Sequence, residues 1–296
     1  MKVLIAEKCG FCFGVEHAIQ MAQKMLEAGK NVYCLGSLIH NKQVVDRLVE
    51  SGLRVVDNLD QIPSSSHQEG GEVPTVLIRS HGCRPELLQE VKRRGFQLAD
   101  ATCVLVKRAQ KLVGQLHRQG YQVIVVGDPN HPETQGVIGY APDVIVVAGP
   151  EDLGKLPPSG RLAVISQTTH SAEDFGKIVG LIASRSDYQE LKVVNTICRE
   201  TARRQESAIQ LCRRVEVMFV LGSPHSANTS QLAHICRREG VDTYHLQNWQ
   251  EFEPSYVAGK RVAGVTAGAS TPDWIIHEFV QKLRRFAHPK NNNQPA

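Results

Sequence analysis

Short apolar runs alternate with stretches of helical spacing along most of the chain. The runs have the length of buried strands and often end in glycine or small polar residues; they are KNVYCLGS, TVLIRSHG, YQVIVVGD, DVIVVAG, LAVISQT, VEVMFVLGS and RVAGVTAG. Between them, segments such as HAIQMAQKMLEAG and VKRAQKLVGQLHRQG place apolar residues on one face of a helix. This alternation predicts an α/β fold with mainly parallel sheets.

The pattern repeats three times in register. Each copy begins with a cysteine that opens a predicted helix, and the β run that follows ends in a glycine; the cysteines are Cys12, Cys103 and Cys198, and the glycines are Gly36, Gly127 and Gly222. Each glycine lies 24 positions after its cysteine. A constant period indicates repeated structural units. We therefore expect three similar α/β lobes in a pseudo-threefold trefoil, over residues 13–102, 103–197 and 198–286, followed by a disordered tail over residues 287–296.

Polar side chains occupy equivalent loops of the three copies. An imidazole or a hydroxyl stands four residues after each glycine, with another polar residue close behind; the pairs are His40 and Asn41, His131 and Glu133, and Ser226 and Asn228. The loop after the next β run is again polar or small, and the three loops are Ser80-His81-Gly82, Gln167-Thr168-Thr169 and Ala267-Gly268-Ala269-Ser270. Because the carboxyl ends of parallel strands converge on a ligand site, we expect these loops to face one cavity.

The three repeat cysteines are candidate iron ligands. A thiolate is the form that binds iron, and the start of a helix lowers the pKa of a thiol through its dipole and free N–H groups. Electron-transfer clusters generally have four cysteine ligands, whereas three would leave one iron of a [4Fe-4S] cluster open. An open iron can act as a Lewis acid on a substrate oxygen. The count of three therefore predicts chemistry at a central cluster.

The other five cysteines lack this registration. Three lie within predicted strands or helices and are expected to be small buried apolar side chains, namely Cys34, Cys212 and Cys236. Cys83 has no counterpart in the repeat and is assigned no role. Cys9 and Cys12 form a CxxC pair, which is also compatible with a redox pair or half of a zinc site, although the chain has no second CxxC.

Six side chains from the polar loops are candidate donors to an anionic substrate. They are His40, His81, His131, Ser226, Asn228 and Ser270. Imidazoles that can carry charge near neutral pH, together with hydroxyl and amide groups, suit a diphosphate better than a neutral ligand. The other histidines lack the registration and are expected to have no part in the site.

Glu133 is a candidate proton source. It lies among the aligned polar residues of the loop after Gly127, and an acid among donors beside a cluster can protonate a leaving group. The alternative is an ordinary turn residue after Pro132. Thr168 is expected to pass on that proton or to orient a substrate hydroxyl.

Composition narrows the class of protein. The chain has 296 residues, with 34 Lys and Arg against 30 Asp and Glu, and the resulting charge of +4 is spread along the chain. Nucleic acid is therefore not an expected partner. No apolar run approaches the ~20 residues that span a bilayer, and eight cysteines are too few for a disulfide scaffold. We expect a cytoplasmic protein in a reducing compartment, with no membrane partner.

Several motifs together resemble one known family, the 4-hydroxy-3-methylbut-2-enyl diphosphate reductases. They occur in the family's order from about residue 2 to residue 283 and are GFCFGVEHAI, IHNKQVVDRL, RSHG, DATCVLV, GDPNHPETQGVIG, SQTT, NTICRETARRQ and GVTAGASTPDW. The resemblance implies a trefoil in which the N-terminal strand, within residues 1–12, joins the third lobe. It also implies a [4Fe-4S] cluster on Cys12, Cys103 and Cys198.

The activity implied by the resemblance is the last step of the non-mevalonate isoprenoid pathway. In this reaction 4-hydroxy-3-methylbut-2-enyl diphosphate loses its hydroxyl by reduction, giving isopentenyl and dimethylallyl diphosphates. The diphosphate would contact the six donors named above, Glu133 would donate a proton, and Thr168 would lie near the hydroxyl with Gln167 alongside. The chain has no GxGxxG nucleotide fingerprint. The implied electron donor is therefore an external ferredoxin or flavodoxin.

One position departs from the family pattern. Ala227 stands where the family commonly has a serine, between Ser226 and Asn228. The missing hydroxyl would weaken diphosphate binding by about 1 kcal/mol, the usual net contribution of a hydrogen bond, although the main-chain N–H of Ala227 could still donate.

Two alternatives remain open from the residues. One is another three-cysteine cluster enzyme, such as a quinolinate synthase-like or diphthamide-synthesis-like protein. The other is a non-catalytic zinc or redox-sensing module.

Overall fold

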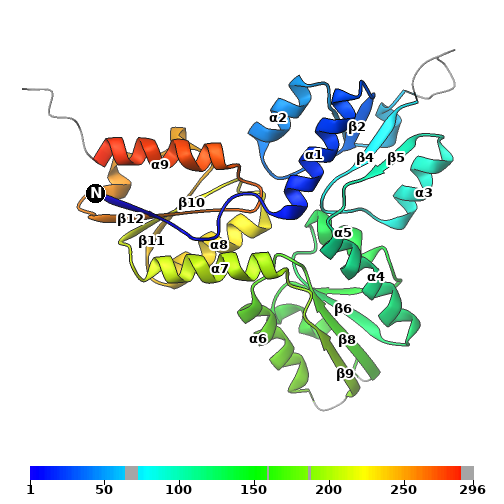
Figure 1. The fold of residues 1–296 in the computed structure, drawn as a ribbon. Coiled ribbons are helices and arrows are strands. Elements are labelled where there is room, and N and C mark those ends of the chain that lie inside the picture. Colours follow the sequence, from blue (N-terminus) through cyan, green and yellow to red (C-terminus); the bar gives the residue numbers. More distant parts are fainter. Residues whose placement is uncertain (64–72, 159, 186–187, 288–296) are drawn as a thin grey trace, which may run out of the picture. The chain divides into compact units, whose positions relative to one another are not determined.

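The described residues form three four-stranded sheets, and every strand pair among them is parallel. The computed structural model describes residues 1–63, 73–158, 160–185 and 188–287 (Figure 1). Two compact units make up the chain. The continuous unit is Phe13–Cys198, and the split unit combines Met1–Cys12 with Arg199–Ala296. Each unit is described by itself.

The continuous unit contains two of the sheets. The first sheet and its helices comprise α1 (Phe13–Glu27), β2 (Val32–Leu35), α2 (Lys42–Glu50), β3 (Arg54–Val56), η1 (Leu59–Gln61), β4 (Thr75–Ile78), α3 (Pro85–Arg93) and β5 (Gln97–Asp100). The second sheet and its helices comprise α4 (Val104–Arg118), β6 (Gln122–Val126), α5 (Pro132–Ile138), β7 (Ile145–Val147), η3 (Pro150–Lys155), β8 (Gly160–Ser166), α6 (Ala172–Ala183) and β9 (Tyr188–Val194).

The split unit contains the third sheet. Its elements are β1 (Lys2–Ile5), α7 (Arg199–Cys212), β10 (Val217–Leu221), α8 (Ala227–Arg238), β11 (Asp242–Leu246), η4 (Trp249–Glu251), η5 (Pro254–Val257), β12 (Val262–Ala267) and α9 (Asp273–Ala287). The helix α9 includes the first residue of the predicted tail, and residues 288–296 lie outside the described part of the chain.

The three sheets share one order of strands. In the continuous unit the orders are β3-β2-β4-β5 and β7-β6-β8-β9, and in the split unit the order is β11-β10-β12-β1. The N-terminal strand β1 therefore takes the edge position that β5 and β9 hold in the other sheets. It pairs with β12 in register from Lys2 with Val262 to Ile5 with Val265. The fold is α/β with three four-stranded parallel sheets, which confirms the predicted fold class.

The central strands are buried on both faces, which explains their continuous apolar sequences. In β6, Val123 and Val125 belong to the apolar cluster that includes Ala109 of α4. The alternate residues Ile124 and Val126 belong to a second cluster, with Phe175 and Ile178 of α6. Successive side chains of a strand point to opposite faces, so helices cover both sides of this sheet.

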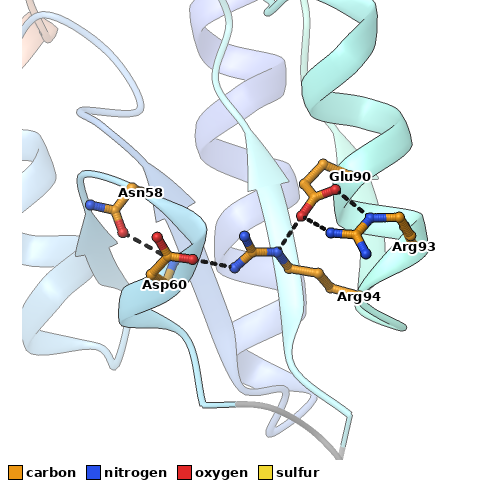
Figure 2. Close-up of polar contacts among 5 residues, drawn as sticks. All are labelled: Asn58, Asp60, Glu90, Arg93 and Arg94. Carbon is orange, nitrogen blue, oxygen red and sulfur yellow. Dashed lines mark hydrogen bonds and ion pairs between the residues drawn. The ribbon is translucent and has the colours of Figure 1, made fainter.

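A network of surface charges fastens the short helix η1 to the end of α3 (Figure 2). Arg94 contacts Asp60 at 2.6 Å and Glu90 at 2.6 Å, and Glu90 also pairs with Arg93 at 2.7 Å. The side chain of Asn58 accepts a hydrogen bond from the main-chain N–H of Asp60 at 3.0 Å. Surface ion pairs of this kind are weakened by salt and contribute little to the free energy of unfolding. The main effect of the network is therefore to orient η1.

Among the residues that the structure describes, no helix combines the length and the apolar character that a membrane span needs.

Candidate functional site

The three repeat cysteines are held in the same way by the main chain. Each donates its N–H to a carbonyl oxygen two residues beyond the end of β12, β4 or β8, and the pairs are Cys12 with Ala269 at 3.1 Å, Cys103 with Ser80 at 3.0 Å, and Cys198 with Thr168 at 2.9 Å. Each cysteine also directly precedes a helix, α1, α4 or α7. These hydrogen bonds to the loops at the strand ends fix the main-chain position of each cysteine, whatever rotamer its side chain adopts.

The chemistry of these thiols fits metal ligation. Cys12, Cys103 and Cys198 form no disulfide and are partly exposed, in contrast to the buried Cys34. A helix start favours the thiolate form that binds iron. Cys103 and Cys198 belong to the continuous unit, and Cys12 belongs to the split unit.

The lack of a side chain at Gly14 allows the first turn of α1 to lie close to Cys103. A Cβ added to Gly14 would lie 2.7 Å from the Sγ of Cys103 and 3.1 Å from its Cβ. Contacts this short do not occur between real side chains, so the first turn of α1 can lie against this thiol only because Gly14 has no side chain. The sequence alone does not predict this contact, because the one signal for Gly14 is its place two residues after Cys12.

The structure brings three of the predicted histidines together. His40 follows β2, His81 follows β4 and His131 caps the N-terminus of α5. Their ring centroids are 4.4 Å apart for His40 and His81, 5.7 Å for His40 and His131, and 5.5 Å for His81 and His131. Their ligand nitrogens lie within 4.8 Å of one another. Such a cluster can surround an anion, and it can also bind a divalent metal ion.

Two of these imidazoles have a lower pKa than the sequence suggested. Burial lowers the pKa of His131 to about 4, although the charge of Asp128 partly opposes the shift. Burial also lowers the pKa of His81 well below its usual value, and the neighbouring His40, His131 and Arg79 add to the effect. Both rings are therefore neutral at pH 7 in the free protein, whereas the sequence suggested groups that are charged near neutral pH. Their close spacing and the loss of water account for the difference.

Glu133 and Thr168 form a buried pair in the continuous unit. The carboxylate oxygens of Glu133 accept hydrogen bonds from the main-chain N–H of Thr168 at 2.7 Å and from its hydroxyl at 2.8 Å. Burial raises the pKa of Glu133, and the two bonds from Thr168 oppose that shift. The carbonyl of Thr168 accepts the N–H of Cys198. One peptide segment therefore connects the candidate acid to a candidate ligand.

Gln167 has mainly a structural role in the observed contacts. Its side-chain oxygen accepts the N–H of Asp128 at 3.0 Å and the hydroxyl of Thr134 at 3.3 Å. Its side-chain nitrogen donates to Thr169 at 2.9 Å. A Cβ on Gly127 would lie 2.7 Å from Gln167. The repeat glycine thus leaves room for a side chain that joins the loops after β6 and β8.

The remaining candidates lie in the split unit. Ser226 caps α8 by accepting the N–H of Thr229 at 3.4 Å, and Ser270 is 5% exposed. Asn228 is 4% exposed, and neither its side-chain oxygen nor its nitrogen has a hydrogen-bond partner in the described part of the chain. An unpaired buried amide is costly, so Asn228 is available for a ligand. Ala227 is the first residue of α8.

The turns on either side of Asn228 are tightly packed. A Cβ on Gly268 would lie 1.9 Å from the hydroxyl oxygen of Thr229, and one on Gly222 would lie 2.9 Å from it. The loop after β12 therefore rests directly on the first turn of α8. This contact places the segment that leads to Ser270 beside the helix that carries Asn228.

Two arginines near the candidate site were missed by the sequence reading. Arg79, just beyond β4, contributes to the low pKa of His81 and His131. Arg204 of α7 is 3% exposed and donates to the carbonyl of Gly10 at 2.9 Å, which ties the segment before Cys12 to α7. Arginine is common on exposed helix faces, so neither its type nor its spacing reveals such a contact.

Burial disfavours the thiolate form of three cysteines outside the repeat, Cys9, Cys34 and Cys83. Burial raises the pKa of Cys83 to about 12 and also raises that of Cys9. Cys34, Cys212 and Cys236 are buried. Cys212 and Cys236 share a thiol hydrogen bond, a contact that their separation in the sequence does not reveal.

Comparison with known proteins gives a consistent result over the whole chain. A family model described as LytB protein matches residues 3–284. A 4-hydroxy-3-methylbut-2-enyl diphosphate reductase of Pelobacter propionicus is 42% identical over 284 residues, which are 96% of this chain and 98% of that relative. The enzyme of the same name from Geotalea daltonii is 40% identical over 292 residues, or 98% of this chain and 100% of the relative.

Two solved structures are similar to the chain. One is described as (E)-4-hydroxy-3-methyl-but-2-enyl diphosphate reductase, the terminal enzyme of the non-mevalonate pathway. It is 39% identical with a TM-score of 0.68 and covers 96% of this chain and 100% of its own. A reductase structure from Plasmodium falciparum has a TM-score of 0.90 at 24% identity, covering 98% of this chain and 89% of its own. The second likeness supports the fold alone.

Proposed function

The chain belongs to the LytB protein family, and we propose that it is an enzyme that reduces 4-hydroxy-3-methylbut-2-enyl diphosphate to isopentenyl and dimethylallyl diphosphates. The observation that carries this proposal is the equivalent main-chain anchoring of Cys12, Cys103 and Cys198. Three thiols fixed in the same way, each at the start of a helix, fit a cofactor that needs one ligand from each lobe.

The proposed cofactor is a [4Fe-4S] cluster with Cys12, Cys103 and Cys198 as its ligands. Partly exposed thiols at helix starts, none of them in a disulfide, have the right chemistry for this role. When bound, the cluster supplies electrons and an iron that can accept a substrate oxygen. A Cβ added to Gly14 would lie 2.7 Å from the Sγ of Cys103, so the main chain of α1 lies close to one of the proposed ligands.

The proposed contacts to the diphosphate are a set of imidazole, hydroxyl and amide groups. They are His40, His81, His131, Ser226, Ala227, Asn228 and Ser270. The neutral state of the buried His81 and His131 affects how such a site works. A bound anion favours the charged form of a nearby imidazole, so substrate binding is expected to be accompanied by proton uptake.

Glu133 is the proposed proton donor. Its raised pKa favours the protonated carboxyl, and the hydroxyl of Thr168 contacts it at 2.8 Å. Removal of a hydroxyl requires a proton on the departing oxygen. The reaction takes up two electrons and two protons, breaks one C–O bond, forms one C–H bond and releases water. Thr168 would orient the substrate hydroxyl toward this acid.

The electrons must come from another protein. A ferredoxin or a flavodoxin is the proposed donor class, because the chain lacks the glycine-rich nucleotide fingerprint that a nicotinamide- or flavin-dependent reductase would carry.

The test is an anaerobic assay of the reconstituted protein with 4-hydroxy-3-methylbut-2-enyl diphosphate and reduced methyl viologen. We expect both products and about four iron and four sulfide per chain. Glu133→Gln should keep its iron but lose at least about 100-fold in turnover, the usual contribution of a general acid. Glu151→Gln, which changes an exposed carboxylate, is the matched control and should remain fully active.

The possible results separate the alternatives. A full cluster without product formation would refute the proposed reaction and favour another three-cysteine cluster enzyme. Zinc in place of iron would favour the metal-binding module, for which the histidine trio offers a second possible site. Full activity of Glu133→Gln would remove Glu133 from the mechanism while leaving the reaction intact.

A further inference from the structure

Two exposed apolar side chains directly follow two of the proposed cluster ligands. Phe13, after Cys12, is 70% exposed, and Val104, after Cys103, is 61% exposed. They are the most exposed large apolar residues in the described ranges of the chain. Single exposed apolar residues are common, but these two share a position relative to the repeat.

The starts of α1 and α4 adjoin, so that Phe13 and Val104 belong to one surface. The contact is made by Gly14, where a Cβ would lie 2.7 Å from the Sγ of Cys103. Phe13 precedes Gly14 and Val104 follows Cys103, so both residues flank this contact. The ring of His17 stacks against Phe13 with centroids 6.1 Å apart.

The exposed face of α4 is positively charged. The helix contains Lys107, Arg108, Lys111 and Arg118 but no acidic residue. Lys107 pairs with Asp100 at 2.7 Å. Arg108 and Lys111 are exposed, and within the described part of the chain no ion pair is formed by either of them. Their positions, four and seven residues after Val104, place them on the same helix face as that residue.

We propose that Phe13, Val104, Arg108 and Lys111, here called the α1–α4 surface, bind the protein that delivers electrons, and that this partner is a small acidic one-electron carrier. The inference rests on the proposed function, because only a cluster held by Cys103 makes electron delivery at this position useful. An apolar centre beside unpaired cations is complementary to a carrier whose own apolar patch has an acidic rim. Glu16 of α1 is exposed nearby, but the cations of α4 outnumber it.

The surface also satisfies the requirements of the reaction. Each docking event transfers one electron from the reduced carrier, which is thereby oxidised, and two events supply the pair needed for each C–O bond that breaks. The carrier must then leave, so the contact has to be transient. Electrostatic attraction meets this need, since it accelerates association more than it slows release.

The test compares the holoenzyme with its Arg108→Glu/Lys111→Glu variant. Binding of an oxidised acidic ferredoxin is measured by calorimetry at low and high ionic strength, and turnover is measured with the reduced ferredoxin and with reduced methyl viologen. The double variant should bind the ferredoxin at least about 10-fold more weakly at low ionic strength, with a smaller difference in salt. Its turnover with methyl viologen, which needs no docking surface, should equal that of the unmodified protein.

The matched control is Lys92→Glu/Arg237→Glu, which makes the same change in net charge at exposed positions on α3 and α8. It should bind the ferredoxin like the unmodified protein. Phe13→Ser/Val104→Ser tests the apolar part and should weaken binding with little dependence on salt.

Several results would overturn the proposal. These are equal ferredoxin binding by the double variant and the control, equal loss of turnover with both donors, or a dimer of the unmodified chain that the double variant dissociates in sedimentation. The last would make the surface an interface between copies of this chain. Failure of the unmodified holoenzyme with methyl viologen would instead refute the proposed reaction.

Discussion

At the scale of single residues, burial of the imidazoles makes the continuous unit sensitive to acid. His131 is 5% exposed, and its folded pKa of about 4 lies well below the ~6.5 of an unfolded chain. The unfolded state therefore takes up a proton that the folded state does not. Stability contributed by the neutral ring is complete above pH ~6.5 and is lost as the pH falls toward the folded value.

His131→Asn should remove this part of the pH dependence. Asparagine can still cap α5 by accepting the N–H of Glu133, as His131 does at 3.2 Å, but it does not titrate. Between pH 7 and pH 5 the unmodified protein should lose about 2 kcal/mol more unfolding free energy than the variant, measured by urea denaturation. His277→Asn, which changes an exposed histidine of α9, is the matched control. A slope that His131→Asn does not alter would mean that His131 titrates normally.

Burial also explains why Glu133 suits proton donation. Two hydrogen bonds from Thr168 favour the carboxylate, but burial has the larger effect and raises the pKa. The carboxyl is thus held in a defined orientation while its proton stays available. A carboxyl at the surface could not combine these properties, because water would solvate its ionised form.

At the scale of elements, the approach of α1 to α4 depends on one small residue. Gly14→Ala should displace the Cys103 thiol or the first turn of α1, because its Cβ would lie 2.7 Å from the Sγ. We expect a loss of about 1–3 kcal/mol in unfolding free energy, as for other overpacked sites. Iron bound after anaerobic reconstitution should also fall to half or less.

A helical glycine with free space around it provides the control. Gly176 lies in α6, and a Cβ there would meet nothing within 4 Å. Gly176→Ala should therefore stabilise the protein by about 0.5–1 kcal/mol through helix propensity and leave the iron content unchanged. If Gly14→Ala behaves in the same way as Gly176→Ala, the contact does not constrain Cys103.

At the scale of the whole molecule, the N-terminal strand completes a sheet whose other strands lie between Val217 and Ala267. The main-chain N–H groups of Lys2 and Ala6 donate to Arg261 and Val265 at 2.8 and 2.9 Å. Because successive N–H groups of a strand point to opposite sides, the main-chain N–H of Leu4, midway between Lys2 and Ala6, also points toward β12. The intervening N–H of Ile5 points away from the sheet, since β1 is an edge strand.

Proline substitutions distinguish an N–H group that points toward β12 from one that points away from the sheet. Leu4→Pro should remove a hydrogen bond to β12 and lower the unfolding free energy by at least about 1 kcal/mol, whereas Ile5→Pro should cost clearly less. Calorimetric melting of both variants measures the difference. Equal losses, or a larger loss for Ile5→Pro, would contradict the pairing of β1 with β12.

Central strands were easier to predict than most edge strands, although the apolar run DVIVVAG became the edge strand β7. The buried runs that became β2, β4, β6, β8, β10 and β12 are continuous apolar sequences, because helices cover both faces. The edge strand β5 (Gln97–Asp100) contains glutamine and aspartate, and β11 (Asp242–Leu246) contains aspartate and histidine. Such sequences do not differ from loops, because an edge strand is specified by the neighbour it pairs with more than by its own apolar content.

The sequence by itself determined the features that depend on local order. These are the alternation of strands and helices, the register of the three cysteines, and the loops that carry His40, His131 and Ser226. Neighbouring residues set these features, because periodicity and helix starts are properties of short segments. The tertiary structure alone decided that His81 and His131 are neutral and that Gly14 lies on Cys103. Each of these depends on atoms that are distant in the sequence and that meet, and exclude water, only after folding.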